Sequence, residues 1–167
     1  MTDVVGPSAG LGSEIIALLT ARGLRIAVAE SLTGGLLVSE LIRSPGASAV
    51  VNGGVVAYNT ALKASVLGVD AQLLATNGAV DPEVAAQMAV GVRVALAVNG
   101  IPADIGISTT GVAGPEPQDG AAVGTFYLGF AIGEAVTTSA MSLIGDRDSI
   151  RSAAVLASLE RLTMLLR

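Results

Sequence analysis

Apolar residues recur at helical and strand spacing through the first quarter of the chain. Segment 8–22 carries them three and four residues apart, which predicts a helix that stops before Gly23. The nearly continuous apolar run 24–30 predicts a buried strand, and 31–43 begins with capping residues and two glycines before it continues as a helix. We therefore expect the chain to turn from strand to helix at Ser31.

The middle of the chain predicts one more strand followed by three helices. Segment 50–58 has the composition of a strand, whereas 60–69 and 71–76 are typical of short helices. The clearest helix signal begins at Asp81, an N-cap residue followed by proline, and extends to about residue 98. This part of the chain thus predicts a strand followed by a helical region.

The last third of the chain predicts a strand, a hairpin and a final helix. The strand covers 103–111 and runs into an irregular loop that contains glycine and proline. Two strand-like segments, 124–132 and 135–144, flank a Gly-Glu pair and predict an antiparallel hairpin, and 146–167 predicts a helix. Strands alternating with helices, plus one hairpin, predict an α/β fold whose mixed sheet carries helices on both faces.

Composition agrees with one folded domain over residues 1–167. Apolar residues make up 51% of the chain and charged residues 14%, so the signature of a disordered chain is absent. With two Tyr, two Phe, no Trp and a net charge of −5, we expect no nucleic-acid partner. No apolar run reaches the roughly 18–20 residues that span a bilayer, and no signal-peptide pattern opens the chain, so we expect no membrane partner and a cytoplasmic location.

Histidine and cysteine are both absent from the sequence. Their absence excludes Ser-His-Asp triads, cysteine nucleophiles and metal sites built on those ligands, and we expect neither a metal nor a cofactor. Of the nine basic residues only Lys63 is a lysine. Because arginine keeps its proton at physiological pH, Lys63 is the only basic side chain that could serve as a neutral amine base. A genome biased toward arginine codons would also explain a single lysine.

Ser31 follows the first predicted strand, where the backbone N–H groups of the next helix point outward without partners. Such a turn can hold a nucleophile beside oxyanion donors, and we expect Thr33, Gly34 and Gly35 to contact the substrate there. The alternative is that Ser31 or Thr33 only caps the helix.

Tyr58 ends the second predicted strand, and Lys63 lies in the helix that follows. Both side chains could face the same carboxyl edge of the sheet as Ser31, where ligands of open α/β sheets collect. Lys63 could accept the Ser31 proton only if burial or nearby positive charge lowered its pKa by some two to three units from about 10.4. Without that shift Lys63 is an ordinary solvated helix residue.

Arg147 and Arg151 stand four residues apart at the start of the last helix and so share one face. This arrangement suits a phosphate, although the interleaved Asp146 and Asp148 could equally bind the two arginines in local salt bridges.

Thr110 and Gly111 end the third predicted strand and open the irregular loop 112–122. A hydroxyl and a glycine at this point could line a phosphate or sugar site. A plain exit from strand to turn explains them nearly as well.

Six sequence blocks, taken in order and spacing, resemble the CinA C-terminal domain family. They cover nearly the whole chain and are AESLTGG, NGGVVAYNTALKASVLGV, NGAVDPEVAAQMAVGV, STTGVAGP, AVGTFYLGF and GDRDSIRSAA. The chain is similar to the free-standing form of the family. The resemblance implies a three-layer α/β/α fold and commonly a homodimer. It also implies an amidase that converts nicotinamide mononucleotide, a pyridine nucleotide, to nicotinic acid mononucleotide and ammonia.

The resemblance also implies roles for single residues. The serine of the family's first block falls on Ser31, its tyrosine on Tyr58 and its lysine on Lys63, while the last block supplies Arg147 and Arg151. These matches imply a Ser31 nucleophile with Lys63 as its base, Tyr58 as an orienting or relaying group, and two arginines that hold the 5′-phosphate.

Three positions depart from the family pattern: Leu32 often corresponds to Cys, Asp81 to Ser, and Ala122 to Lys. The residue at 122 lies in a loop that we expect near the substrate. The departure there leaves open a nucleotide-binding or regulatory domain without turnover, or an amidase for another pyridine nucleotide.

Overall fold

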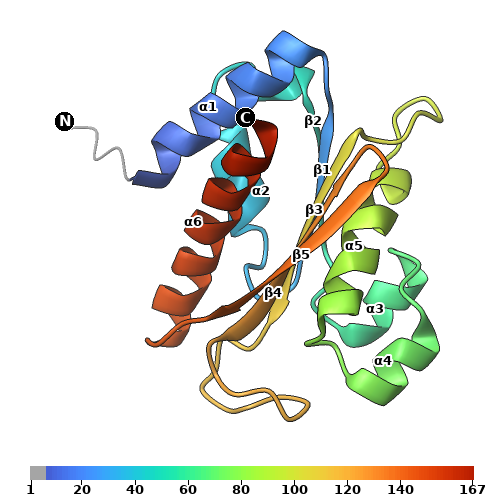
Figure 1. The fold of residues 1–167 in the computed structure, drawn as a ribbon, viewed down its shortest axis with the longest axis vertical. Coiled ribbons are helices and arrows are strands. Elements are labelled where there is room, and N and C mark those ends of the chain that lie inside the picture. Colours follow the sequence, from blue (N-terminus) through green and yellow to red (C-terminus); the bar gives the residue numbers. More distant parts are fainter. Residues whose placement is uncertain (1–6) are drawn as a thin grey trace.

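The computed structural model describes residues 7–167, which form helices on both sides of a sheet (Figure 1). In chain order the elements are α1 (Pro7–Arg22), β1 (Ile26–Glu30), α2 (Leu36–Ile42), the 3₁₀ turn η1 (Ala47–Ala49), β2 (Val51–Val56), α3 (Thr60–Ser65), α4 (Ala71–Asn77), α5 (Pro82–Ala95), β3 (Ile105–Gly111), β4 (Thr125–Ile132), β5 (Ala135–Ser142) and α6 (Arg147–Leu166).

In this described part of the chain five strands make one sheet in the order β2-β1-β3-β4-β5. Strand β1 pairs in parallel with both β2 and β3, whereas β4 runs antiparallel to β3 and to β5. The α/β class, the mixed sheet and the hairpin predicted from the sequence are confirmed. The parallel pairing brings the carboxyl ends of β1, β2 and β3 to one edge of the sheet, which is where ligands bind in open α/β sheets.

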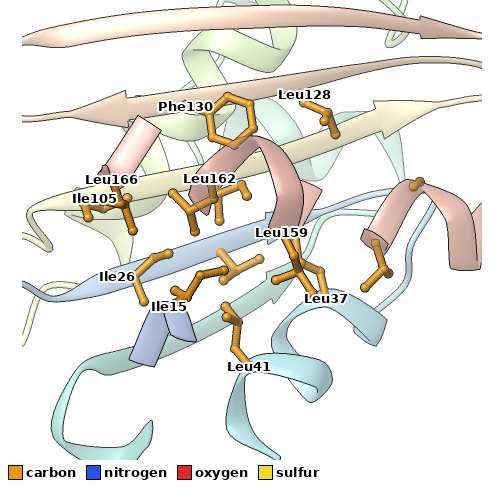
Figure 2. Packing of buried hydrophobic residues seen from close by; sticks show 14 of the residues in the cluster. Ile15, Ile26, Leu37, Leu41, Ile105, Leu128, Phe130, Leu159, Leu162 and Leu166 are labelled. Atoms are coloured by element: carbon orange, nitrogen blue, oxygen red, sulfur yellow. The ribbon is translucent and has the colours of Figure 1, made fainter. Parts of the chain in front are cut away.

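Helices α1, α2 and α6 cover one face of the sheet, and α3, α4 and α5 lie on the other (Figure 1). The first face holds the larger apolar cluster, part of which Figure 2 shows around Ile26, Leu159 and Phe130. On the second face Ala27 and Ala29 of β1 pack in a cluster with Met88 of α5. All five residues of β1 are buried, so the strand that carries Ser31 at its end is held rigidly on both faces.

Helix α5 begins as the sequence predicts. The Asp81 side chain accepts hydrogen bonds from the N–H groups of Glu83 and Val84, and Pro82 occupies the first helical position. The helix ends at Ala95, three residues earlier than predicted, where a tight turn takes over. No helix among residues 7–167 is both long and apolar enough to cross a membrane.

The start of α2 differs from the prediction. The helix begins at Leu36, five residues after Ser31, and the intervening residues form a turn that we call the Ser31–Gly35 turn. Gly34 and Gly35 adopt φ values of 60° and 98°, in the left-handed region that excludes them from a regular helix. The capping pattern of the sequence therefore belongs to a separate turn rather than to the first residues of the helix.

Candidate active site

Ser31 and Lys63 meet at the carboxyl edge of the sheet. Ser31 directly follows β1, and α3 carries Lys63 back toward it, so that Lys63 Nζ lies 3.1 Å from Ser31 Oγ. Nζ also donates to the carbonyl oxygen of Ala57 at 2.8 Å, which fixes its position. Lys63 is 1% exposed and Ser31 8%. The lysine is therefore a buried amine in hydrogen-bond contact with a serine hydroxyl, and not a solvated helix residue.

Burial changes the chemistry of Lys63. Desolvation lowers the pKa of the amine from its ordinary 10.5 to about 8, against the opposing effect of the Asp119 carboxylate, which raises it. With that pKa, about one molecule in ten carries a neutral amine at pH 7. The neutral amine has a lone pair that can accept the Ser31 proton along the contact that Nζ makes as a donor when charged.

The carboxylate of Glu30 caps the start of α2. Glu30 is fully buried, and its side chain accepts hydrogen bonds from the N–H groups of Gly35 and Leu37 at 3.0 Å and of Val38 at 2.8 Å. These contacts compensate for the cost of burying the charge, and the helix start favours a negative group. Neither Ser31 nor Thr33 caps the helix, because Glu30 does so.

Most backbone groups of the Ser31–Gly35 turn already have partners. The Ser31 N–H donates to the Thr109 carbonyl at 3.0 Å, and the Gly34 N–H donates to the Ser31 carbonyl at 3.1 Å. With Gly35 bound to Glu30, the N–H groups of both glycines are occupied. The described residues provide no acceptor for the N–H groups of Leu32 and Thr33. These two donors directly follow Ser31, and they are the ones of the turn that remain without an acceptor.

Hydroxyl groups of β3 form hydrogen bonds with the Ser31–Gly35 turn and with the 77–81 segment. Thr33 Oγ1 and Thr109 Oγ1 are 2.8 Å apart and fully buried. The Thr110 hydroxyl donates to the Ala79 carbonyl at 2.6 Å, so it holds the 77–81 segment against the sheet.

A cavity of about 460 Å³ opens over the Ser–Lys pair. This volume lies within the range of roughly 300–1,000 Å³ that small-molecule sites occupy. Six of the residues predicted for the site line this cavity: Ser31, Tyr58, Lys63, Thr110, Gly111 and Arg147. Leu32 and the loop residues Glu116 and Gln118 also line it. The other predicted residues, Thr33, Gly34, Gly35 and Arg151, are not among those that line the cavity.

Arg147 joins two walls of the cavity. Its guanidinium donates to the Gly114 carbonyl of the loop and, at 2.7 Å, to the Tyr58 hydroxyl. Tyr58 is 59% exposed and contacts Arg147 rather than Lys63, whose position depends on Ala57. The structure therefore joins the predicted tyrosine to the predicted phosphate-binding arginine.

Arg151 lies one helical turn further along α6 and has different partners. Its Nε donates to the Leu32 carbonyl at 3.0 Å and its Nη2 to the Thr33 carbonyl at 3.2 Å. A third contact reaches the exposed Asp148 at 3.5 Å, which is the local ion pair considered from the sequence, while Asp146 caps α6 by accepting from the Ser149 N–H. Arg151 thus faces the back of the Ser31–Gly35 turn and not the cavity.

Sequence reasoning did not assign Glu30 as a helix cap or Asp119 as a charge near Lys63. Glu30 carried one usable signal, because a carboxylate that ends an otherwise apolar strand must find donors when it is buried. Asp119 lies in the irregular loop between β3 and β4, where the spacing of residues along the sequence does not indicate where a side chain lies. Among residues 7–167 no group of three or more acidic side chains comes together in a way that could hold a metal ion.

The fold and site define an α/β protein with a buried Ser–Lys pair at the carboxyl edge of its parallel strands. The family described as CinA C-terminal domain matches residues 8–166, and the chain belongs to this family.

Individual relatives agree with that assignment. A CinA-like protein of Frankia casuarinae is 46% identical over 161 residues, which cover 96% of this chain and 36% of that protein. The crystal structure of the competence/damage inducible protein CihA from Agrobacterium tumefaciens is 34% identical, with a TM-score of 0.90 over 100% of both chains. The competence damage-inducible protein A (ComA) from Klebsiella pneumoniae is 34% identical, with a TM-score of 0.87 over 95% of this chain and 96% of that one. The chain spans about a third of the length of the curated relatives it matches.

Proposed function

We propose that the chain is an amidohydrolase that converts nicotinamide mononucleotide to nicotinic acid mononucleotide and ammonia, with Ser31 as nucleophile and Lys63 as base. The observation that carries the proposal is the 3.1 Å contact between Ser31 Oγ and the buried amine of Lys63, whose pKa falls to about 8. A serine beside a base of lowered pKa is the arrangement that nucleophilic catalysis requires. The nucleotide substrate follows from the family resemblance of the sequence blocks.

In the first half of the reaction, neutral Lys63 takes the Ser31 proton and Oγ attacks the carboxamide carbon. The tetrahedral intermediate collapses, the C–N bond breaks, and the leaving amine takes the proton from Lys63 to depart as ammonia. In the second half Lys63 removes a proton from water, and the resulting hydroxide attacks the acyl carbon. The acyl–oxygen bond to Ser31 then breaks, the acid leaves, and Oγ regains its proton.

The oxyanion is held by the N–H groups of Leu32 and Thr33. They are the two donors of the Ser31–Gly35 turn without an acceptor in the described chain, whereas those of Gly34 and Gly35 are occupied. Two donors that the turn holds in fixed positions stabilise developing charge without reorganisation.

The nucleotide lies along the cavity, with its phosphate at Arg147. This guanidinium borders the cavity and keeps donors beyond those used for Gly114 and Tyr58. Thr110 and Gly111 line the wall at the end of β3, where the sugar would pass.

The direct test is ammonia release from nicotinamide mononucleotide by the purified protein, coupled to an optical readout. We expect ammonia and the acid in equal amounts, and a transient acyl-Ser31 adduct by mass spectrometry. Ser31→Ala is expected to abolish turnover while the protein stays folded. A nucleotide that binds tightly without ammonia release would favour the alternative, a binding domain without turnover, and release only from other pyridine nucleotide amides would change the substrate.

The role of Lys63 is tested by two substitutions. Lys63→Arg keeps the charge but cannot accept a proton at working pH, so it should be as inactive as Lys63→Met. Retention of most activity by Lys63→Arg would show that Lys63 acts through its charge alone, and the Ser–Lys mechanism would be withdrawn.

A further inference from the structure

The geometry of Arg151 gives it a function that differs from phosphate binding. Its side chain is 26% exposed and reaches from α6 to the Ser31–Gly35 turn, where it donates to the carbonyls of Leu32 and Thr33. Arg151 itself is not among the residues that line the cavity, where a substrate phosphate would bind. The guanidinium is therefore engaged with backbone directly behind the candidate nucleophile.

The contact with the Leu32 carbonyl determines the direction of one amide proton. That carbonyl and the Thr33 N–H belong to the same planar trans peptide, in which the oxygen and the hydrogen point in opposite directions. A donor that holds the oxygen at the back of the Ser31–Gly35 turn directs the N–H the other way. A charged donor on the carbonyl also polarises the peptide, which makes its N–H a stronger donor.

The rest of the turn is fixed by other groups, so the Leu32–Thr33 peptide is the element that Arg151 controls. Glu30 holds the N–H of Gly35, and Thr109 holds the N–H of Ser31. Gly34 leaves room for the guanidinium, because a Cβ at this position would lie 3.2 Å from Arg151 Nη2. The local sequence thus accommodates the arginine at close range.

We propose that Arg151 is a positioning residue that aims and polarises the Thr33 N–H as an oxyanion donor for the reaction at Ser31. The inference rests on the proposed function for the reaction class, but not on the identity of the substrate. It explains why a cation stands near the N-terminus of α6, where the helix dipole disfavours positive charge.

The test compares Arg151→Gln with Arg161→Gln, an exposed arginine on the same helix that serves as the matched control. Loss of a full oxyanion donor costs about 10²–10³ in kcat, and an indirect loss should be smaller. We expect Arg151→Gln to lower kcat about 10- to 100-fold, with KM within about threefold of wild type. Arg161→Gln should match wild type. The pH at half-maximal rate should stay the same, since Lys63 is untouched.

A second readout needs no nucleotide. The rate at which a fluorophosphonate labels Ser31 should fall by a similar factor in Arg151→Gln, because phosphonylation also develops charge on an oxygen. Arg151→Lys, which can reach one carbonyl, should be labelled at a rate between those of wild type and Arg151→Gln. If Arg151→Gln folds poorly, Arg151→Lys replaces it in the same test. Added methylguanidine should restore part of the rate of Arg151→Ala.

Three results would overturn the inference. One is a raised KM with intact kcat, which would make Arg151 a substrate ligand; another is a wild-type labelling rate in Arg151→Gln. The third is a loss that tracks the unfolded fraction and resists methylguanidine. Wild-type protein labelled at Ser31 but unable to release ammonia would refute the proposed substrate and leave this inference standing. Wild-type protein that neither releases ammonia nor is labelled at Ser31 would refute both.

Discussion

Lys63 is the only lysine of the chain, and its burial should be measurable as a pH-dependent gain in stability. An unfolded chain restores the pKa of the amine from about 8 to its ordinary 10.5. Below pH 8 both states hold the proton, and the folded state bears the full cost of a buried cation. Between pH 8 and 10.5 the unfolded state binds more protons, so the free energy of unfolding rises with pH.

The size of this gain follows from the shift in pKa. A difference of one unit corresponds to about 1.4 kcal/mol, so the change from 10.5 to about 8 corresponds to about 3 kcal/mol in all. Of this, about 2.5 kcal/mol should be regained between pH 7 and pH 10. Lys63→Met lacks the group and should lack the gain.

The assay is urea unfolding of wild type and Lys63→Met at intervals from pH 7 to pH 10. The composition suits it, because histidine and cysteine are absent and both proteins keep the same two tyrosines. Loss of the donor to the Ala57 carbonyl adds a constant offset to the variant, so the slopes are compared. Parallel curves would show an ordinary pKa for Lys63 and no neutral base near pH 7. The titration of the single ¹⁵N-labelled lysine side chain gives an independent reading of the same pKa.

Three further variants test other parts of the site. Arg147→Ala should raise KM for the nucleotide far more than for the corresponding riboside, because a charge-assisted bond to phosphate contributes about 1.5–3 kcal/mol; equal losses would place the phosphate elsewhere. Asp119→Asn removes a carboxylate that raises the pKa of Lys63, so the rising limb of the rate–pH profile should move to lower pH. Glu116, Tyr58 and Arg147 also line this cavity. A move of the rising limb to higher pH would indicate that one of them, rather than Asp119, has the larger effect on the pKa of Lys63. Glu30→Gln should lower the free energy of unfolding by about 1–3 kcal/mol, measured in urea, since an uncharged amide replaces a carboxylate that accepts three N–H groups; a variant as stable as wild type would contradict this role.

The sequence was sufficient to bring Ser31 and Lys63 together. Ser31 follows a buried strand, Lys63 lies just after the next one, and parallel strands end at the same edge, so topology alone makes the two neighbours. Tyr58 and Arg147 reach the cavity for the same reason.

The sequence pattern could not predict which of the two arginines of α6 faces the cavity. Arg147 and Arg151 share a helix face, but they lie one turn apart along it, and that distance separates a cavity wall from the back of a turn. Which of them meets the cavity depends on how α6 crosses α2, which is a tertiary property. The observed start of α2 at Leu36 differs from the predicted start at Ser31 for a related reason. The sequence does not show that Gly34 and Gly35 adopt left-handed conformations, which a regular helix excludes.

The bond between Arg147 and Tyr58 also gives the chain an internal optical reporter. The chain has no tryptophan, so its tyrosine fluorescence comes from two residues, of which Tyr58 is largely exposed and lines the cavity. A ligand anion that engages the Arg147 guanidinium changes the surroundings of the phenol bound to it. Occupancy of the cavity can therefore be followed by fluorescence in unmodified protein, without a label and without turnover.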